Sequence, residues 1–431
     1  MTSGDIVLGD WEKHWLLQHL DDDACCVNWL VELERPVDPA LVEAALAAVR
    51  RVFPFPFAGL RVAPGTASVL AVPRPRRPIG EYLTYWPQAE GGFESFARTL
   101  VNDRLDPLED GLFRCHLVAG PVPMLAFKAT HLIGDAYTNH WLRAAFAWAS
   151  GQLHAGRPAE LTSPPTAYSL GVADVMSRLR VAPREIEDSV RRARRLRVPA
   201  MTAPAPGGEL RVLRAVITPA RFATVVRRAI ALGVTPVALL GAAVAGAVRS
   251  SYDPWGQAPG DYFAVSVPRD LRSVLGRDRE LGNLCYPQGI PILADDPVDT
   301  ESMAKVISAR LRAGAMNRIM YRYFCNQLRE TRTRPVRREP APAGDRRPVR
   351  PLPVLGATEI PARPDIDAIA GVRVLRTAYQ TPIFTRRQSG GQVHLGCTLR
   401  WHPDLDDRLR AFAARLFTEL LGPPPVDWEL L

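Results

Sequence analysis

Apolar positions along the first half of the chain repeat with two different periods, which predicts strands and helices in alternation. Apolar runs with the period of strands predict strands over 26–33, 113–118 and 124–129. Between the last two runs lies Gly-Pro-Val-Pro, which predicts that they form a hairpin. Apolar residues three or four positions apart predict helices over 9–20, 40–52, 93–105 and after 135.

Helix faces and helix starts can be assigned from the same pattern. The opening helix is expected to pack Trp15, Leu16 and Leu20 inward. Asp38 followed by Pro39 has the pattern of an N-cap with proline in the first turn. The helix after 135 is expected to have one apolar side, made of Trp141, Leu142, Ala145, Phe146 and Trp148.

The second half of the chain begins again with a strand and two helices. A strand is predicted over 213–217, and the helix over 219–232 is expected to turn Phe222, Val225, Val226 and Ile230 inward. Thr235 caps the next helix, whose small apolar residues suit a crowded core. Later elements are predicted as a strand over 263–267, successive strands within 353–401 and a last helix over 406–421.

A short polar corner joins the hairpin to the helix after 135. It carries His131 and, four positions later, Asp135, and Gly134 supplies backbone freedom just before the acid. An imidazole at a strand end can project into a cleft, and a carboxylate can fix the loop by a charge-assisted hydrogen bond to a basic partner. A neutral imidazole can take a proton from an alcohol or amine that attacks an activated acyl group.

This motif is short, and one HxxxD match alone is weak support for catalysis. No Ser or Cys lies in a nucleophile elbow, so covalent catalysis of the hydrolase type has no support. His116, on the first hairpin strand, is expected to be a packing residue.

Net charge and cysteine content limit the partners, metal sites and cellular location that can be expected. A net charge of +9, mostly from Arg, suits acidic or phosphorylated partners such as CoA, an acidic carrier protein or nucleic acid, but no nucleic-acid module is visible. The 6 cysteines show neither a CxxC pair nor zinc spacing, so reduced thiols and no metal site are expected. With no secretory signal and no apolar run long enough for a transmembrane segment, we expect a soluble, cytoplasmic protein.

Composition divides the chain into three parts. Residues 1–165 form a first subdomain, 166–208 a linker with a basic helix over 185–198, and 209–431 a second subdomain. Within the second, the Pro- and Arg-rich stretch 329–350 is expected to be a loop.

Two segments resemble a known family. THLIGDA, residues 130–136, resembles the HHxxxDG signature of the condensation-domain and CoA-dependent acyltransferase superfamily, with Thr130 in place of the first His. VPRDLRSVLG followed by ELGN resembles the "VPVDLRxxL…LGN" segment of the same superfamily. It sets Arg272 on the arginine that pairs with the motif aspartate, and Asn283 on the GN position.

The resemblance implies an α/β fold of two subdomains like chloramphenicol acetyltransferase, with a central tunnel and one strand that crosses between them. A thioester donor, acyl-CoA or an acylated phosphopantetheine carrier, would enter from one face, and an alcohol or amine acceptor from the other. His131 would act on the acceptor, Asp135 and Arg272 would support it, and the tunnel would be lined by Thr130, Gly134 and Asn283. No permanently bound cofactor is implied, and an acyl or peptidyl carrier protein is the expected partner.

Departures from the motif leave other functions open. Thr130 and Ala136 replace motif residues, and GATE at 356–359 replaces a more usual Ser-Asn-Gly sequence. A non-catalytic condensation-like protein that binds a carrier or a partner enzyme is one alternative, and the same fold recruited to cyclisation is another. Nucleic-acid binding is a distant third, suggested only by Arg content.

Overall fold

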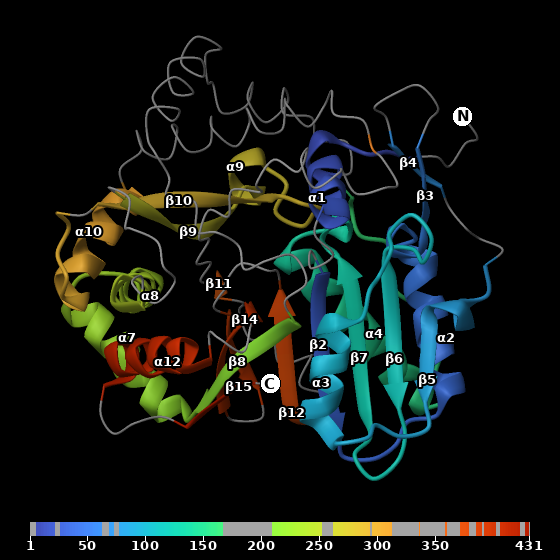
Figure 1. Cartoon of the computed structure of the whole chain (residues 1–431). Helices are drawn as coiled ribbons and strands as arrows, with labels where there is room; N and C mark the ends of the chain where they lie inside the picture. The colour runs from blue at the N-terminus through green and yellow to red at the C-terminus, as the bar shows by residue number, and fades with distance from the viewer. Residues whose placement is uncertain are drawn as a thin grey trace.

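A computed structural model of the chain describes residues 6–21, 26–62, 69–72, 77–166, 209–251, 262–293, 295–312, 336, 358–359, 371–378, 385–389, 392–401, 406–422 and 427–430. The predicted linker and basic helix, and the predicted loop over 329–350, lie outside these ranges apart from Thr166 and Val336. Among the described residues there are two sheets of five strands, one in each half of the molecule, and two smaller sheets (Figure 1).

The first large sheet has the order β12-β2-β7-β6-β5. Its strands are β2 (Cys26–Leu33), β5 (Leu83–Trp86), β6 (Phe113–Val118), β7 (Met124–Thr130) and β12 (Gly371–Ala378). β6 and β7 form the predicted antiparallel hairpin, and β7 is the central strand. β7 is buried along its whole length, so the residue that follows it starts from a rigid support.

Helices cover both faces of this sheet (Figure 1). α2 (Pro39–Val52) and α4 (Ala136–His154) pack against each other on one face, over Trp29, Val31 and Phe127. α3 (Gly92–Asn102) lies on the other face, over Leu30 and Ala126. α2 begins as predicted, since the Asp38 side chain accepts a hydrogen bond from the backbone N–H of Ala40 at 2.9 Å.

Smaller elements complete the first half. α1 (Asp10–Asp21) contacts the 3₁₀ turn η3 (His131–Ile133) directly after β7. The others are a small sheet of β1 (Ile6–Val7), β4 (Val69–Val72) and β3 (Gly59–Val62), and the 3₁₀ turns η1 (Phe55–Phe57) and η2 (Ile79–Tyr82).

The second large sheet has the order β11-β13-β14-β8-β15. Its strands are β8 (Glu209–Ile217), β11 (Thr358–Glu359), β13 (Thr385–Ser389), β14 (Gln392–Trp401) and β15 (Trp428–Leu430). The helices of this half are α7 (Pro219–Ala231), α8 (Pro236–Ser251), α10 (Thr300–Arg312) and α12 (Asp406–Leu421). α8 is the buried centre of this half, packed between α7, α10 and α12.

A two-stranded ribbon reaches from the second half over the end of the first sheet (Figure 1). It consists of β9 (Tyr262–Asp270) and β10 (Cys285–Leu293), joined through α9 (Arg272–Leu275). The segment that joins the two strands carries Arg272 and Asn283. This ribbon brings both residues to the turn after β7.

Two further connections join the halves. β12, from the C-terminal part of the chain, pairs antiparallel with β2, so the predicted strand crossing is confirmed. The side-chain amide of Asn102 on α3 donates to the Leu210 carbonyl at 3.0 Å and accepts from the Leu210 N–H at 2.8 Å. The predicted fold class, an α/β fold of two subdomains like chloramphenicol acetyltransferase, is confirmed.

Three details of the predicted elements are wrong. Ile230 is 71% exposed, because Ala229 instead takes the buried position in the last turn of α7. Trp148 is 41% exposed, since Ala149 takes its place beside Ala145 and Phe146 on the buried side of α4. The helix predicted over 93–105 ends at Asn102, and Asp103 has extended backbone.

Within the described residues, no single helix is both long and apolar enough to cross a bilayer. α7 and α8 reach the required length and composition only when taken together, and they are bent by 98° at their junction.

Candidate active site

The turn after β7 has a conformation that its sequence requires. Asp135 is the N-cap of α4, and its Oδ1 accepts from the Thr138 N–H at 3.1 Å. Gly134 has φ of 145°, in the region that side chains rarely adopt, and a Cβ there would lie 2.5 Å from the Thr138 Cβ. Because only glycine fits, Gly134 allows the chain to turn from His131 directly into the cap.

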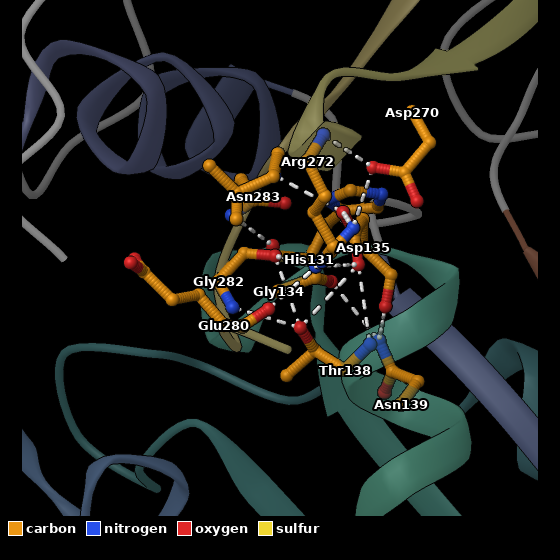
Figure 2. A network of polar contacts seen from close by, with 11 residues as sticks. His131, Gly134, Asp135, Thr138, Asn139, Asp270, Arg272, Glu280, Gly282 and Asn283 are labelled. Carbon is orange, nitrogen blue, oxygen red and sulfur yellow. Dashed lines mark hydrogen bonds and ion pairs between the residues drawn. The ribbon is translucent and has the colours of Figure 1, made fainter. Parts of the chain in front are cut away.

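Arg272 reaches Asp135 from the second half of the molecule and binds it through both oxygens (Figure 2). The Nη1–Oδ2 distance is 2.8 Å and the Nη2–Oδ1 distance is 3.0 Å. Both side chains are almost fully buried, with 3% and 4% of their surfaces exposed. The ion pair expected between these two residues is therefore present, in the bidentate geometry that arginine favours with carboxylates.

Arg272 is itself fixed by several contacts. Its Nε donates to the Glu280 carbonyl at 2.8 Å, and its Nη1 lies 3.1 Å from Asp270 Oδ1. The guanidinium carbon lies 4.4 Å from the centre of the Tyr137 ring. Although burial acts to lower the pKa of Arg272, its contacts with Asp135 and Asp270 raise it, so the charge is retained.

The segment around Gly282 is attached to the same turn by backbone contacts (Figure 2). The Leu284 N–H donates to Asp135 Oδ2 at 3.0 Å, and the Asp135 N–H donates to the Gly282 carbonyl at 3.3 Å. The Gly282 N–H donates to the Thr138 hydroxyl at 2.8 Å. Asp135 thus joins a helix of the first half to a loop of the second through side chain and backbone.

The side chain of Asn283 binds the backbone carbonyl groups of His131 and of the next residue, Leu132. Its Nδ2 donates to the His131 carbonyl at 3.0 Å and to the Leu132 carbonyl at 3.3 Å. Thr130, before the histidine, is fully buried, and its backbone N–H donates to the Leu112 carbonyl at 2.9 Å. The backbone of His131 is therefore fixed from both directions.

The His131 ring is covered by α1. The Trp15 ring stacks on it with 4.0 Å between ring centres, and only 8% of His131 is exposed. Burial lowers the pKa of His131 to about 3, against the opposing effect of its hydrogen bonds, so the imidazole is neutral at pH 7. The side chain was expected to project into a cleft, whereas the structure places it in a covered position.

Glu12 lies on the same helix as Trp15 and contacts Asn283. Only 3% of the residue is exposed. Burial raises the pKa of its carboxyl group to about 8, although hydrogen bonds from its surroundings act against this shift, so the group is protonated at neutral pH. An acidic residue on the apolar face of a helix can be recognised in the sequence as a candidate for a buried acid. Nothing in the sequence indicated that Glu12 would lie near Asn283.

Comparison with known proteins gives the fold. No model of a protein family matches the sequence, and no curated protein matches it. The structure superposes on the first condensation domain of the calcium-dependent antibiotic synthetase with a TM-score of 0.66, 14% identity and full coverage of both chains. The chain has the condensation-domain fold. The condensation domain of the monacolin K polyketide synthase gives a TM-score of 0.63 at 14% identity, covering 98% of this chain and 100% of that one.

The condensation-domain fold also occurs in proteins described by other activities. An epimerization domain of tyrocidine synthetase B matches with a TM-score of 0.64 and 14% identity, over 97% of this chain and 96% of that one. At such identities the likeness shows the fold and leaves the reaction open.

Within the condensation-domain fold, the structure brings together all six residues selected from the sequence. These are Thr130, His131, Gly134, Asp135, Arg272 and Asn283. Sequence reasoning did not place Trp15 beside His131 or Glu12 near Asn283, and it missed Thr138, which follows Asp135 at the spacing of a capped residue. His116 lies elsewhere in the sheet, where it accepts a hydrogen bond from Trp86 Nε1 at 3.3 Å.

Proposed function

We propose that this protein is an acyltransferase that moves an acyl group from a thioester to an alcohol or amine. The observation that carries the proposal is the His131 turn, which is fixed by a buried ion pair between the two halves of a condensation-domain fold. Catalytic groups need such rigid support, because small displacements reduce rates strongly.

The proposed reaction uses His131 in its neutral form. The oxygen or nitrogen of the acceptor bonds to the thioester carbonyl carbon while the imidazole accepts its proton, the carbon–sulfur bond then breaks, and the imidazolium returns that proton to the leaving thiolate. A pKa of about 3 in the covered state makes the ring a weak base. Negative charge that develops on the tetrahedral species stabilises the imidazolium, so the ring becomes more basic as the reaction proceeds.

The donor in this proposal is acyl-CoA or an acyl group on a phosphopantetheine arm. Two condensation domains that share the fold belong to an antibiotic synthetase and a polyketide synthase, and a further structure with this fold is a nonribosomal peptide synthetase, which supports a carrier protein as partner. A small-molecule alcohol or amine is the acceptor, and no permanently bound cofactor is needed. Because Trp15 covers His131, substrate entry must displace this ring or approach along its edge.

The test compares His131→Ala with His116→Ala across a set of acyl-CoA and S-acyl-pantetheine donors, with amine and alcohol acceptors and products detected by mass spectrometry. His116 is the matched control, because it is also buried with a pKa lowered to about 3, chiefly by burial. We expect His131→Ala to lose about 100-fold or more in turnover and His116→Ala to retain activity. Full transfer by folded His131→Ala would remove this residue from the mechanism.

A second function is favoured by a specific observation, the covered position of His131 beside Thr130. In this alternative the protein binds an acylated carrier or a partner enzyme without catalysis. Intact-mass measurements that show binding of a loaded carrier but no transfer to any acceptor would support it. Recruitment of the fold to cyclisation would instead give a product formed without an added acyl group.

A further inference from the structure

Two buried histidines of the first half each contact a tryptophan, but in different geometry. The Trp15 ring lies face to face on the His131 ring, with 4.0 Å between ring centres and 29° between ring planes. The ring centres of Trp86 and His116 are 6.4 Å apart, and the Trp86 Nε1–H donates to His116 Nδ1 at 3.3 Å. Trp15 thus presents the face of its ring to a histidine, whereas Trp86 presents the N–H group at its edge.

The two geometries act in opposite directions on the charge of the histidine. The face of an aromatic ring carries negative potential and attracts a cation, whereas its edge is positive. The Trp86 N–H needs the lone pair of a neutral imidazole, so a proton on that nitrogen of His116 would remove the hydrogen bond. Burial keeps the resting His131 ring neutral, and the face of Trp15 lowers the cost of charging it.

Face stacking does not cover the atoms through which an imidazole reacts. The lone pair of the unprotonated nitrogen lies in the plane of the ring, so a proton arrives at the edge of the ring and not at its face. Trp15 can therefore stay in place over His131 while an acceptor approaches along the edge.

The His131 ring needs a support that the backbone of the turn cannot give. Asn283 fixes the carbonyl groups of His131 and Leu132, but the torsion that rotates an imidazole about its Cβ–Cγ bond is broad. Trp15 reaches the ring from α1, which packs against the 3₁₀ turn that begins with His131. Its stacked ring restricts this rotation.

The carboxylate of Asp135 is committed to other partners. Arg272 binds both of its oxygens, and the backbone N–H groups of Thr138 and Leu284 donate to the same two atoms. In a catalytic triad, a carboxylate orients the histidine and stabilises its charged form. Here the carboxylate joins the two halves of the molecule instead, so these two tasks need another group.

We propose that Trp15 is a positioning residue of the candidate active site, whose indole face orients the His131 ring and stabilises the imidazolium that forms when this ring accepts a proton. The stabilising role rests on the proposed function, because acyl transfer creates the imidazolium, whereas the orienting role does not. An aromatic face attracts the cation more than the neutral ring, so Trp15 acts on the transition state and raises kcat rather than substrate affinity.

The first experiment compares the kinetics of Trp15→Leu and Trp15→Phe with those of the control Trp86→Leu. Leucine keeps an apolar cover over His131 without an aromatic face, and phenylalanine keeps a smaller aromatic face. Trp15→Leu should lower kcat about 3- to 30-fold with KM unchanged, and Trp15→Phe should lose less. Trp86→Leu should keep the wild-type kcat, since Trp86 contacts His116.

Two kinetic results would overturn the proposal. One is a kcat of Trp15→Leu that equals or exceeds that of wild type, which would make the indole a simple cover. The other is a change in KM alone, which would make Trp15 a substrate contact.

Proton NMR tests the orientation of the ring without any activity. The ring current of a stacked indole should move the ring C–H resonances of His131 upfield, and their loss in His131→Ala assigns them. They should move downfield in Trp15→Leu and stay in place in Trp86→Leu. If they do not move in Trp15→Leu, the proposal is overturned even where acyl transfer is found. If they move but no donor supports transfer, the proposed function fails and the orienting role of Trp15 stands.

Discussion

At the scale of single residues, the Asp135–Arg272 pair is an ion pair whose two side chains are almost fully buried. A buried charge without its partner is expensive, so Asp135→Asn should reduce the free energy of unfolding by about 3–5 kcal/mol. Urea denaturation measures this loss. The control is Glu301→Gln, which breaks the pair of Arg228 with Glu301, whose side chains are 32% and 52% exposed. That change should remain within about 1 kcal/mol, and equal losses in both variants would contradict the assignment.

Two buried cysteines in the first sheet should differ in reactivity. Burial acts to raise the pKa of the Cys26 thiol, but His19 and Lys128 outweigh it and lower the pKa overall. Burial alone raises the pKa of Cys115. Because the thiolate is the reactive species, alkylation of Cys26 by iodoacetamide should begin at a lower pH than that of Cys115.

Peptide mass spectrometry across a pH series measures both thiols in the same sample. The pH dependence is compared rather than the absolute rate, since local opening differs between two buried positions. His19→Gln should shift the Cys26 profile toward that of Cys115. An unchanged profile would mean that His19 does not act on this thiol.

At the scale of elements, the turn between β7 and α4 depends on one glycine. Gly134→Ala would place a Cβ 2.5 Å from Thr138 in a backbone conformation that alanine rarely adopts. We expect a loss of about 2–4 kcal/mol in unfolding free energy together with lost transfer activity. Gly151→Ala is the matched control, because it lies within α4 with open space around its Cα and should be neutral or slightly stabilising. Equal effects would show that the turn tolerates a side chain.

Elements with strong local signals were predictable from the sequence. The caps at Asp38 and Thr235 and the β6–β7 hairpin depend on neighbouring residues, and the structure has them as predicted. Ile230 fits the helical period of its neighbours but is exposed, because the packing of α7 decides where its apolar face ends. Periodicity identifies a face and cannot tell how far the neighbouring elements extend over it.

The candidate site was partly predictable through the resemblance to the superfamily. That resemblance pointed to Asp135 and Arg272 as a pair, and the structure joins them although they lie far apart in the chain. The cover of Trp15 over His131 and the contact of Glu12 with Asn283 depend on where α1 lies. No local pattern encodes that tertiary placement.

At the scale of the whole molecule, three connections make the halves depend on each other. They are the Asp135–Arg272 pair, the Asn102–Leu210 contact and the pairing of β12 with β2. Leu210 and Val212 of β8 also pack with the α3 face of the first sheet, so part of the hydrophobic core is shared. A change at the ion pair therefore acts on the stability of both halves.

The pairing of β12 with β2 also sets an order of events during synthesis. β2 leaves the ribosome early, but its partner, residues 371–378, follows more than three hundred positions later. For most of translation the apolar strand Cys26–Leu33 has one edge without this neighbour. Such an edge invites association with other nascent chains, so efficient production of this protein in a cell should depend on chaperones that shield it.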